Sequence, residues 1–241
     1  MKVALLVSGH LRTFKQCLES QKKHLVEPFQ CDVFVHTWDT IEASTKSWHK
    51  NHMSNRQTKD NDLQYIKKVF NPIKIVVEKQ VDYEISGGLP SSNISLNGLK
   101  NMTYSYKKVR QLMIEHQTNT NTEYDLIVKI RPDIMLLKTF DRNFFDLNKE
   151  SILFFGNLSP VKSGTGEKKF FHNFRALDIM SICTNDRASD LLFGHFDNFE
   201  KYYLNDDWIH SPYLDLIIDN KIDFNISTRY IYGSSWKIIR G

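Results

Sequence analysis

Val3-Ala-Leu-Leu-Val-Ser-Gly-His-Leu-Arg-Thr13, near the start of the chain, is the stretch that decides the fold. Its first five residues are apolar and partly β-branched, which predicts a buried strand that ends in a turn at Ser8-Gly9-His10. Apolar residues at helical spacing follow as far as Pro28, and Cys31-Asp-Val-Phe-Val-His36 predicts a second strand. A strand, a short turn, a helix and a second strand are the usual beginning of a parallel α/β sheet.

The same alternation continues along the chain. Further strands are predicted at 73–77, 124–130, 151–155, 178–183, 222–226 and 230–232, and helices at 63–70, 99–117, 187–203 and 213–218. Polar or glycine-containing stretches indicate loops at 40–62, 86–93 and 161–169. Neither a repeat nor a linker-like change in composition divides the sequence, so we expect a single domain over residues 1–241.

The composition is that of an ordinary folded protein, with 41% hydrophobic and 25% charged residues. A formal net charge of +4 is far from the basic footprint of a nucleic-acid-binding protein. The apolar start is too short for a signal peptide, and no run approaches the length of a membrane span. Cys17, Cys31 and Cys183 lack metal-binding spacing and indicate free thiols. We therefore expect a cytoplasmic protein without a nucleic-acid partner. Its basic residues between Lys46 and Lys108 would favour peripheral contact with the inner face of an anionic membrane.

Three groups of polar residues follow predicted strands, which is where open α/β sheets bind their ligands. The first group is the turn Ser8-Gly9-His10 together with Arg12. Gly9 would let a ligand approach the backbone closely, and the guanidinium of Arg12 suits a phosphate. A lone glycine is neither a dinucleotide-binding fingerprint nor a P-loop, so an ordinary strand-to-helix turn is the alternative.

The second group, His36-Thr-Trp-Asp39, ends the second strand. Trp38 would stack on a base or a sugar, and Asp39 would accept a hydrogen bond from a ribose hydroxyl. The alternative is a buried tryptophan that closes the core. His10 and His36 are notable only for their places at strand ends, because no histidines have the spacing of a metal site.

The third group is Lys129-Ile-Arg-Pro-Asp133. Charged residues inside a central strand are costly to bury without partners. Lys129 and Arg131 alternate onto one face, and Asp133 follows two residues later. Pro132 cannot donate to a sheet, so the strand ends here. Two cations and a carboxylate at a strand end indicate a site for a diphosphate and a metal ion. An internal network of ion pairs is the alternative.

Taken together, the blocks Val3 to Phe14, Cys31 to Trp38 and Tyr124 to Asp133 resemble a known family. This family is the WavE-like group of small glycosyltransferases from bacterial capsule and lipopolysaccharide clusters, with relatives in large DNA viruses. The spacing of the blocks agrees as well, and the resemblance covers about residues 1 to 240. It implies a GT-A-like, Rossmann-related α/β fold with a mixed, mainly parallel sheet flanked by helices. It also implies transfer of a hexosyl or pentosyl group from a nucleotide-sugar donor to a surface glycan or lipid-linked acceptor, in lipopolysaccharide, capsule or a viral glycan.

In folds of this kind the loop after the first strand and the end of the second strand hold the nucleotide. The resemblance therefore implies donor binding by Ser8, Gly9, His10, Arg12, Trp38, Asp39, Lys129, Arg131 and Asp133. An Asp-x-Asp motif usually holds the metal ion and the diphosphate, and this position is Arg131-Pro132-Asp133 here. The resemblance implies that Arg131 neutralises the diphosphate directly, while Asp133 either binds Mn²⁺ or Mg²⁺ alone or contacts the sugar.

An inverting transfer would need a carboxylate base near the acceptor hydroxyl, and the place of Asp178 after the fifth strand region favours that residue. A retaining route would not need this base in the same way. Two other classes of function stay open. One is another nucleotide-dependent transferase, such as a nucleotidyltransferase, which would release pyrophosphate or AMP. The other is a catalytically silent sugar-binding relative, because the first aspartate of the motif is missing.

Overall fold

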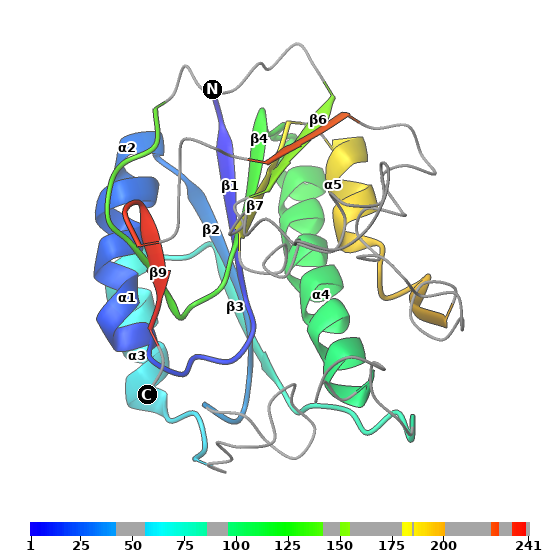
Figure 1. Ribbon diagram of the computed structural model, residues 1–241. Helices are drawn as coiled ribbons and strands as arrows, with labels where there is room; N and C mark the ends of the chain where they lie inside the picture. Colours follow the sequence, from blue (N-terminus) through cyan, green and yellow to red (C-terminus); the bar gives the residue numbers. More distant parts are fainter. Residues whose placement is uncertain are drawn as a thin grey trace, which may run out of the picture.

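The computed structural model describes residues 1–41, 56–85, 96–141, 150–154, 180–184, 186–200, 223–226 and 233–239. Its centre is a seven-stranded sheet in the order β3-β2-β1-β4-β7-β6-β8 (Figure 1). The strands are β1 (Val3–Ser8), β2 (Asp32–Trp38), β3 (Lys74–Glu78), β4 (Leu126–Ile130), β6 (Ser151–Phe154), β7 (Met180–Cys183) and β8 (Asp223–Ile226). Strands β1 to β4 run parallel, whereas β7 is antiparallel to both β4 and β6. The expected α/β class with a mixed, mainly parallel sheet is confirmed.

Strands β1 and β4 lie side by side in the middle of the sheet. Every residue of both strands is buried, which explains their uninterrupted apolar character. Leu5 of β1 is in register with Val33 of β2 on one side and with Val128 of β4 on the other. These central strands therefore fix the edge of the sheet at which the loops after β1, β2 and β4 meet.

Helices cover both faces of the sheet (Figure 1). They are α1 (Phe14–Gln21), the π-helical turn η1 (Lys22–Val26), α2 (Glu27–Phe29), α3 (Asp60–Phe70), α4 (Leu96–Thr120) and α5 (Asp186–Phe193). The segment from α1 to α2 packs with α3 on one face, and α4 packs with α5 on the other. The flanking helices expected from the sequence are thus present.

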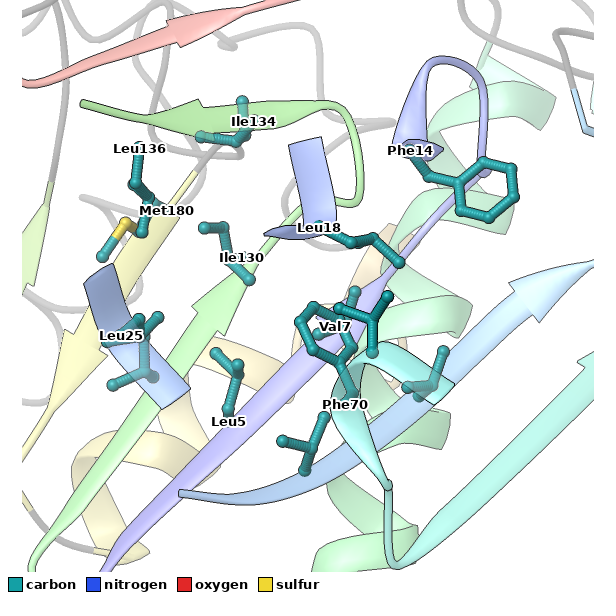
Figure 2. Close-up of a cluster of buried hydrophobic side chains, with 14 of the residues drawn as sticks. Leu5, Val7, Phe14, Leu18, Leu25, Phe70, Ile130, Ile134, Leu136 and Met180 are labelled. Carbon is teal, nitrogen blue, oxygen red and sulfur yellow. The ribbon is translucent and has the colours of Figure 1, made fainter. Parts of the chain in front are cut away.

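Alternate strand residues enter two separate cores because successive side chains of a strand point to opposite faces. Figure 2 shows the first core, which brings Leu5 and Val7 of β1 into one cluster with Phe14 and Leu18 of α1. In the second core, Leu6 of β1 packs with residues of α4, and Tyr106, Val109 and Met113 are buried there at helical spacing.

A small second sheet joins β5 (Ile134–Leu136) to β9 (Trp236–Ile238) in antiparallel pairing. It is held to α1, since the Gln21 side-chain amide donates to the Ile134 carbonyl at 2.7 Å. The Leu136 amide likewise donates to the Ser20 hydroxyl at 3.0 Å. The sequence did not predict β9, because a three-residue strand carries too little periodicity. Because β9 pairs with β5, Ile239 lies beside the loop that follows β1.

Several predicted boundaries differ from the structure. Pro28 does not end the first helical segment, since α2 continues directly from η1 and contains Pro28 near its start. The segment ends at Phe29, and Gln30 follows with a left-handed φ of 52°. Helix α5 ends earlier than predicted, whereas α3 and α4 begin earlier. The predicted elements at 213–218 and 230–232, and the loops at 86–93 and 161–169, lie outside the described residues.

The three cysteines are free thiols, as the sequence predicts. Within the described ranges, no helix combines the length and the apolar character that crossing a membrane would require.

Candidate functional site

The candidate site lies where the chain changes direction within the sheet. From β1 the chain passes to β2 on one side, whereas β4 is the neighbour of β1 on the other side. This is a topological switch point, and open α/β sheets bind ligands at such points beyond the carboxyl ends of their strands. The loop after β1 carries Arg12, and the segment after β4 carries Arg131 and Asp133.

Arg12, Arg131 and Asp133 form a compact arginine–aspartate cluster across this switch point. Nη1 of Arg12 donates to Oδ2 of Asp133 at 3.1 Å, although the two residues are 121 positions apart. Arg131 binds the same carboxylate as a fork, with Nε to Oδ1 at 2.9 Å and Nη2 to Oδ2 at 2.5 Å. Burial raises the pKa of Asp133, but Arg131 and then Arg12 lower it more, so the net pKa is below the usual value. The cluster therefore carries two positive charges and one negative charge.

The exposed side chains of this cluster are positively charged, whereas its covered side chain is negatively charged. The Asp133 side chain is 1% exposed, whereas the side chains of Arg131 and Arg12 are 16% and 23% exposed. The two cations therefore reach solvent and the anion lies beneath them. A partly desolvated guanidinium pair with this outward charge suits an anionic ligand such as a phosphate.

The backbone around the cluster is tied down from two sides. Arg12 has a left-handed φ of 46°, and its amide donates to the Ile41 carbonyl at 2.7 Å. After β9, the Ile239 carbonyl accepts from the Thr13 hydroxyl at 2.5 Å, and the Ile239 amide donates to the Asp133 carbonyl at 3.0 Å. A non-glycine residue in this conformation persists only where its surroundings hold it. These bonds supply that restraint.

Ser8 is the last residue of β1, and Gly9 and His10 follow it in the turn that leads to Arg12. Ser8 is completely buried, and its Oγ has no hydrogen-bond partner among the described residues. Gly9 has a φ of +114°, and a Cβ built on it would meet no atom of the described residues within 4 Å. The Gly9 carbonyl accepts from the Thr37 hydroxyl at 2.9 Å, which anchors the turn to β2. The turn therefore presents open space at a position that only glycine adopts without strain.

His10 is held in its neutral form. Burial is the main cause that lowers its pKa to about 4, partly offset by a hydrogen bond with the Thr40 carbonyl. Because that carbonyl oxygen can only accept, Nδ1 of His10 carries the proton in this 2.9 Å bond. Its Nε2 is thereby an acceptor at neutral pH.

The end of β2 differs from the ligand-stacking hypothesis. Trp38 is 1% exposed, and its ring stacks on Tyr104 of α4 with centroids 6.0 Å apart. His36 meets the same indole edge-on at 5.0 Å. Trp38 is therefore a buried core residue, which is the alternative that the sequence also allowed. Asp39 is half-buried, and its amide donates to the Glu78 carbonyl at 2.9 Å.

Lys129 does not lie with Arg131 and Asp133. It is completely buried, and its Nζ lies 3.8 Å from the centroid of the Tyr106 ring on α4. Val128 and Ile130 of β4 enter the core on the α1 side, which leaves Lys129 on the α4 side. The expectation that Lys129 and Arg131 share a face was incorrect, because β4 ends at Ile130 and its alternation stops there.

A hydrogen-bonded chain that the sequence did not predict crosses the same end of the sheet. Nδ1 of His36 lies 2.7 Å from the Ser105 hydroxyl, and its Nε2 lies 3.1 Å from the Glu78 carboxylate. The His36 bond is the largest cause that lowers the pKa of Glu78 to about 2. Ser105 and His36 are both fully buried, so this chain fastens α4 to β2 and β3 rather than exposing a nucleophile. The sequence signals were His36 at the end of the second strand and an acid at the end of the third.

The donor set around Asp133 does not fit a divalent cation. Mn²⁺ and Mg²⁺ need several oxygen ligands, and both Asp133 oxygens are already bound by guanidinium groups. A cation at this carboxylate would face two positive charges at close range. Among the described residues, no three His, Cys, Asp or Glu side chains gather into a group that could hold a metal. Asp178, the expected base, lies outside the described residues.

Comparisons with known proteins add distant likenesses. No protein-family model matches the chain, and no curated protein sequence matches it. One similar solved structure is a glycosyltransferase involved in the glycosylation of the major capsid of PBCV-1, with a TM-score of 0.41 and 7% identity, covering 100% of this chain and 94% of that one. Another is the glycosyltransferase GlyE of Streptococcus pneumoniae TIGR4, with a TM-score of 0.43 and 8% identity. The match to GlyE covers 94% of this chain but only 45% of GlyE.

Proposed function

We propose that this protein is a glycosyltransferase that moves a hexosyl or pentosyl group from a nucleotide-sugar donor to a surface glycan or lipid-linked acceptor. The observation that carries the proposal is the arginine–aspartate cluster at the β1–β4 switch point. Two guanidinium groups that reach solvent at this place have the charge and the hydrogen-bond donors that suit the diphosphate of such a donor. The three sequence blocks that resemble the WavE-like family contain the cluster and the strands that position it.

The cluster would act on the leaving group. In the transfer, the bond between the anomeric carbon and the diphosphate oxygen breaks, and the acceptor oxygen bonds to that carbon. Negative charge grows on the departing nucleoside diphosphate, and fixed positive groups stabilise it without reorganising. Arg12 and Arg131 are the residues assigned to this task. In an inverting transfer, the acceptor proton would pass to a carboxylate, and Asp178 stays our proposal for it.

The buried Ser8 hydroxyl and the open space over Gly9 support a donor at the same place. A buried hydroxyl that finds no partner among the described residues is costly, and a ligand that bonds to it would remove the cost. The Asp39 carboxylate, one residue after β2, stays assigned to a ribose hydroxyl.

The test is release of nucleoside diphosphate from a panel of uridine and guanosine diphosphate sugars, using the full chain. We expect Arg12→Gln and Arg131→Gln each to lower the rate about 100- to 1,000-fold, the cost of removing one preorganised charge-stabilising donor. The matched control is Arg187→Gln, since the Arg187 side chain is 65% exposed and binds Glu150 at 2.7 Å. This control should keep the full rate.

The products separate the rival functions. Release of pyrophosphate instead of a nucleoside diphosphate would replace sugar transfer with nucleotidyl transfer. No turnover with any donor, together with measurable glycan binding, would identify a silent sugar-binding protein and refute the enzyme proposal.

A further inference from the structure

We propose that Asp133 is a positioning residue, and that Arg12 and Arg131 bind the donor diphosphate directly without a bridging divalent cation. This inference rests on the proposed function and goes beyond it, because it assigns the chemistry of the anion site. The geometry that carries it is the fork from Arg131 and the added bond from Arg12 on one covered carboxylate.

The carboxylate oxygens of Asp133 are engaged on their protein side. Oδ1 accepts from Nε of Arg131, and Oδ2 accepts from Nη2 of Arg131 and Nη1 of Arg12. With 1% of the side chain exposed, Asp133 offers almost no surface to a metal ion or a substrate. A metal could reach it only by displacing the cations, which would leave two guanidinium groups beside a divalent charge.

The same contacts orient the two arginines. An arginine side chain is long, and holding it in one orientation costs conformational entropy. The bidentate bond fixes the plane of the Arg131 guanidinium, and the shared Oδ2 fixes the Arg12 guanidinium beside it. The Arg131 carbonyl accepts from the Gln21 side-chain amide at 3.0 Å, which holds the backbone of Arg131 as well. Asp133 would thus act through the arginines and not touch the substrate itself.

Three possible roles of Asp133 predict different results for anion binding by the unmodified protein and by Asp133→Asn. A metal ligand would make binding depend on the cation in the unmodified protein. A mere neighbouring negative charge would make the variant bind anions more tightly, because the cluster would gain positive charge. A positioning residue would make the variant bind more weakly, because the guanidinium groups lose their shared acceptor. We expect a weakening of about ten- to a hundredfold, the range for loss of a charge-assisted hydrogen bond.

The experiment is isothermal titration of the full chain with pyrophosphate, UDP and GDP, once with EDTA and once with MnCl₂. We expect at least one of these probes to bind with the same Kd in both buffers. Arg131→Lys, which keeps the charge and loses the fork, should weaken binding in the same way as Asp133→Asn. This lysine variant also tests the inference if Asp133→Asn does not fold. Arg187→Lys serves as the surface control and should bind as the unmodified protein does.

Other outcomes overturn the inference. Binding only in the presence of MnCl₂, no binding in either buffer, or tighter binding by a folded Asp133→Asn variant would each do so. The proposed function fails separately. Sugar transfer that strictly needs Mn²⁺ would keep the function and reject the metal-free site, whereas metal-independent diphosphate binding without any transfer would do the reverse.

Discussion

Gly9→Ala is the most direct probe of the turn after β1. The φ of Gly9 is +114°, which an L-residue rarely adopts, yet within the described part of the chain no atom lies within 4 Å of the Cβ that alanine would add. The substitution therefore introduces backbone strain without a steric clash. It also puts a methyl group into the open space where we place the donor.

The magnitude follows from two opposing effects. Holding a non-glycine residue in a sparsely populated region costs about 1–3 kcal/mol. Alanine also restricts the unfolded chain, which returns about 0.4–1 kcal/mol. We expect Gly9→Ala to lower the free energy of unfolding by about 1–2 kcal/mol. If the methyl group displaces the diphosphate, affinity for a nucleoside diphosphate should fall about tenfold or more, equivalent to about 1.4 kcal/mol.

Gly233→Ala is the matched control. Gly233 has a φ of +85°, and no atom in the described ranges lies within 4 Å of an added Cβ. Gly233 lies before β9 and outside the loops of the switch point. Both variants should lose similar stability in urea unfolding followed by circular dichroism. Only Gly9→Ala should lose affinity in isothermal titration. Equal affinity of the two variants would refute the placement of the donor over Gly9, and unchanged stability of Gly9→Ala would refute the strain.

Three further substitutions test other parts of the structure. Burial lowers the pKa of His195 from 6.5 to about 3. As the pH falls, His195 is therefore protonated in the unfolded chain before it is protonated in the folded protein. Its contribution to stability is complete above pH 6.5 and decreases as the pH falls toward 3. His195→Gln should therefore reduce the pH dependence of the free energy of unfolding by about 1.4 kcal/mol per pH unit in that window, measured by urea unfolding; an unchanged slope would contradict it. Trp38→Phe should cost about 1–3 kcal/mol of stability and leave the Kd for a nucleoside diphosphate unchanged, because the indole is buried against Tyr104; lost affinity at full stability would restore the stacking role. Ser8→Ala should keep or raise stability by up to about 1 kcal/mol, because it removes a buried hydroxyl without a partner, and should weaken donor binding; unchanged binding would remove Ser8 from the site.

The sheet and its flanking helices were predictable because their signals are local. A strand buried on both faces needs an uninterrupted apolar run, which Val3 to Val7 and Leu126 to Val128 supply. A helix that covers a sheet needs an apolar stripe, which Tyr106, Val109 and Met113 supply. Neither pattern encodes the partner of a strand. The antiparallel insertion of β7 beside β4 and the pairing of β9 with β5 therefore came only from the structure.

The candidate site was predictable in part for the same reason. Ends of parallel strands gather at one edge, so the sequence alone brings the loops of Arg12 and Arg131 together. The sequence could not show that both arginines share the oxygens of Asp133, because this depends on side-chain directions across 121 positions. It also misplaced Lys129 by extending the two-residue alternation beyond Ile130, where the strand ends.

Lys129, near the end of β4, and Arg131, just after it, show why charge count alone does not identify a binding site. Lys129 and Arg131 are two residues apart, and the sequence alone makes both of them candidates for binding a diphosphate. Lys129 is fully buried under the Tyr106 ring, so its charge can reach a ligand only through the protein. Arg131 lies just past the strand, where the guanidinium binds a covered carboxylate and still reaches solvent. With a net charge of only +4, the protein has a weak overall field, so anion recognition has to come from charges that are both fixed and accessible. Of these two cations only Arg131 meets both conditions, and Arg12 meets them through the same carboxylate.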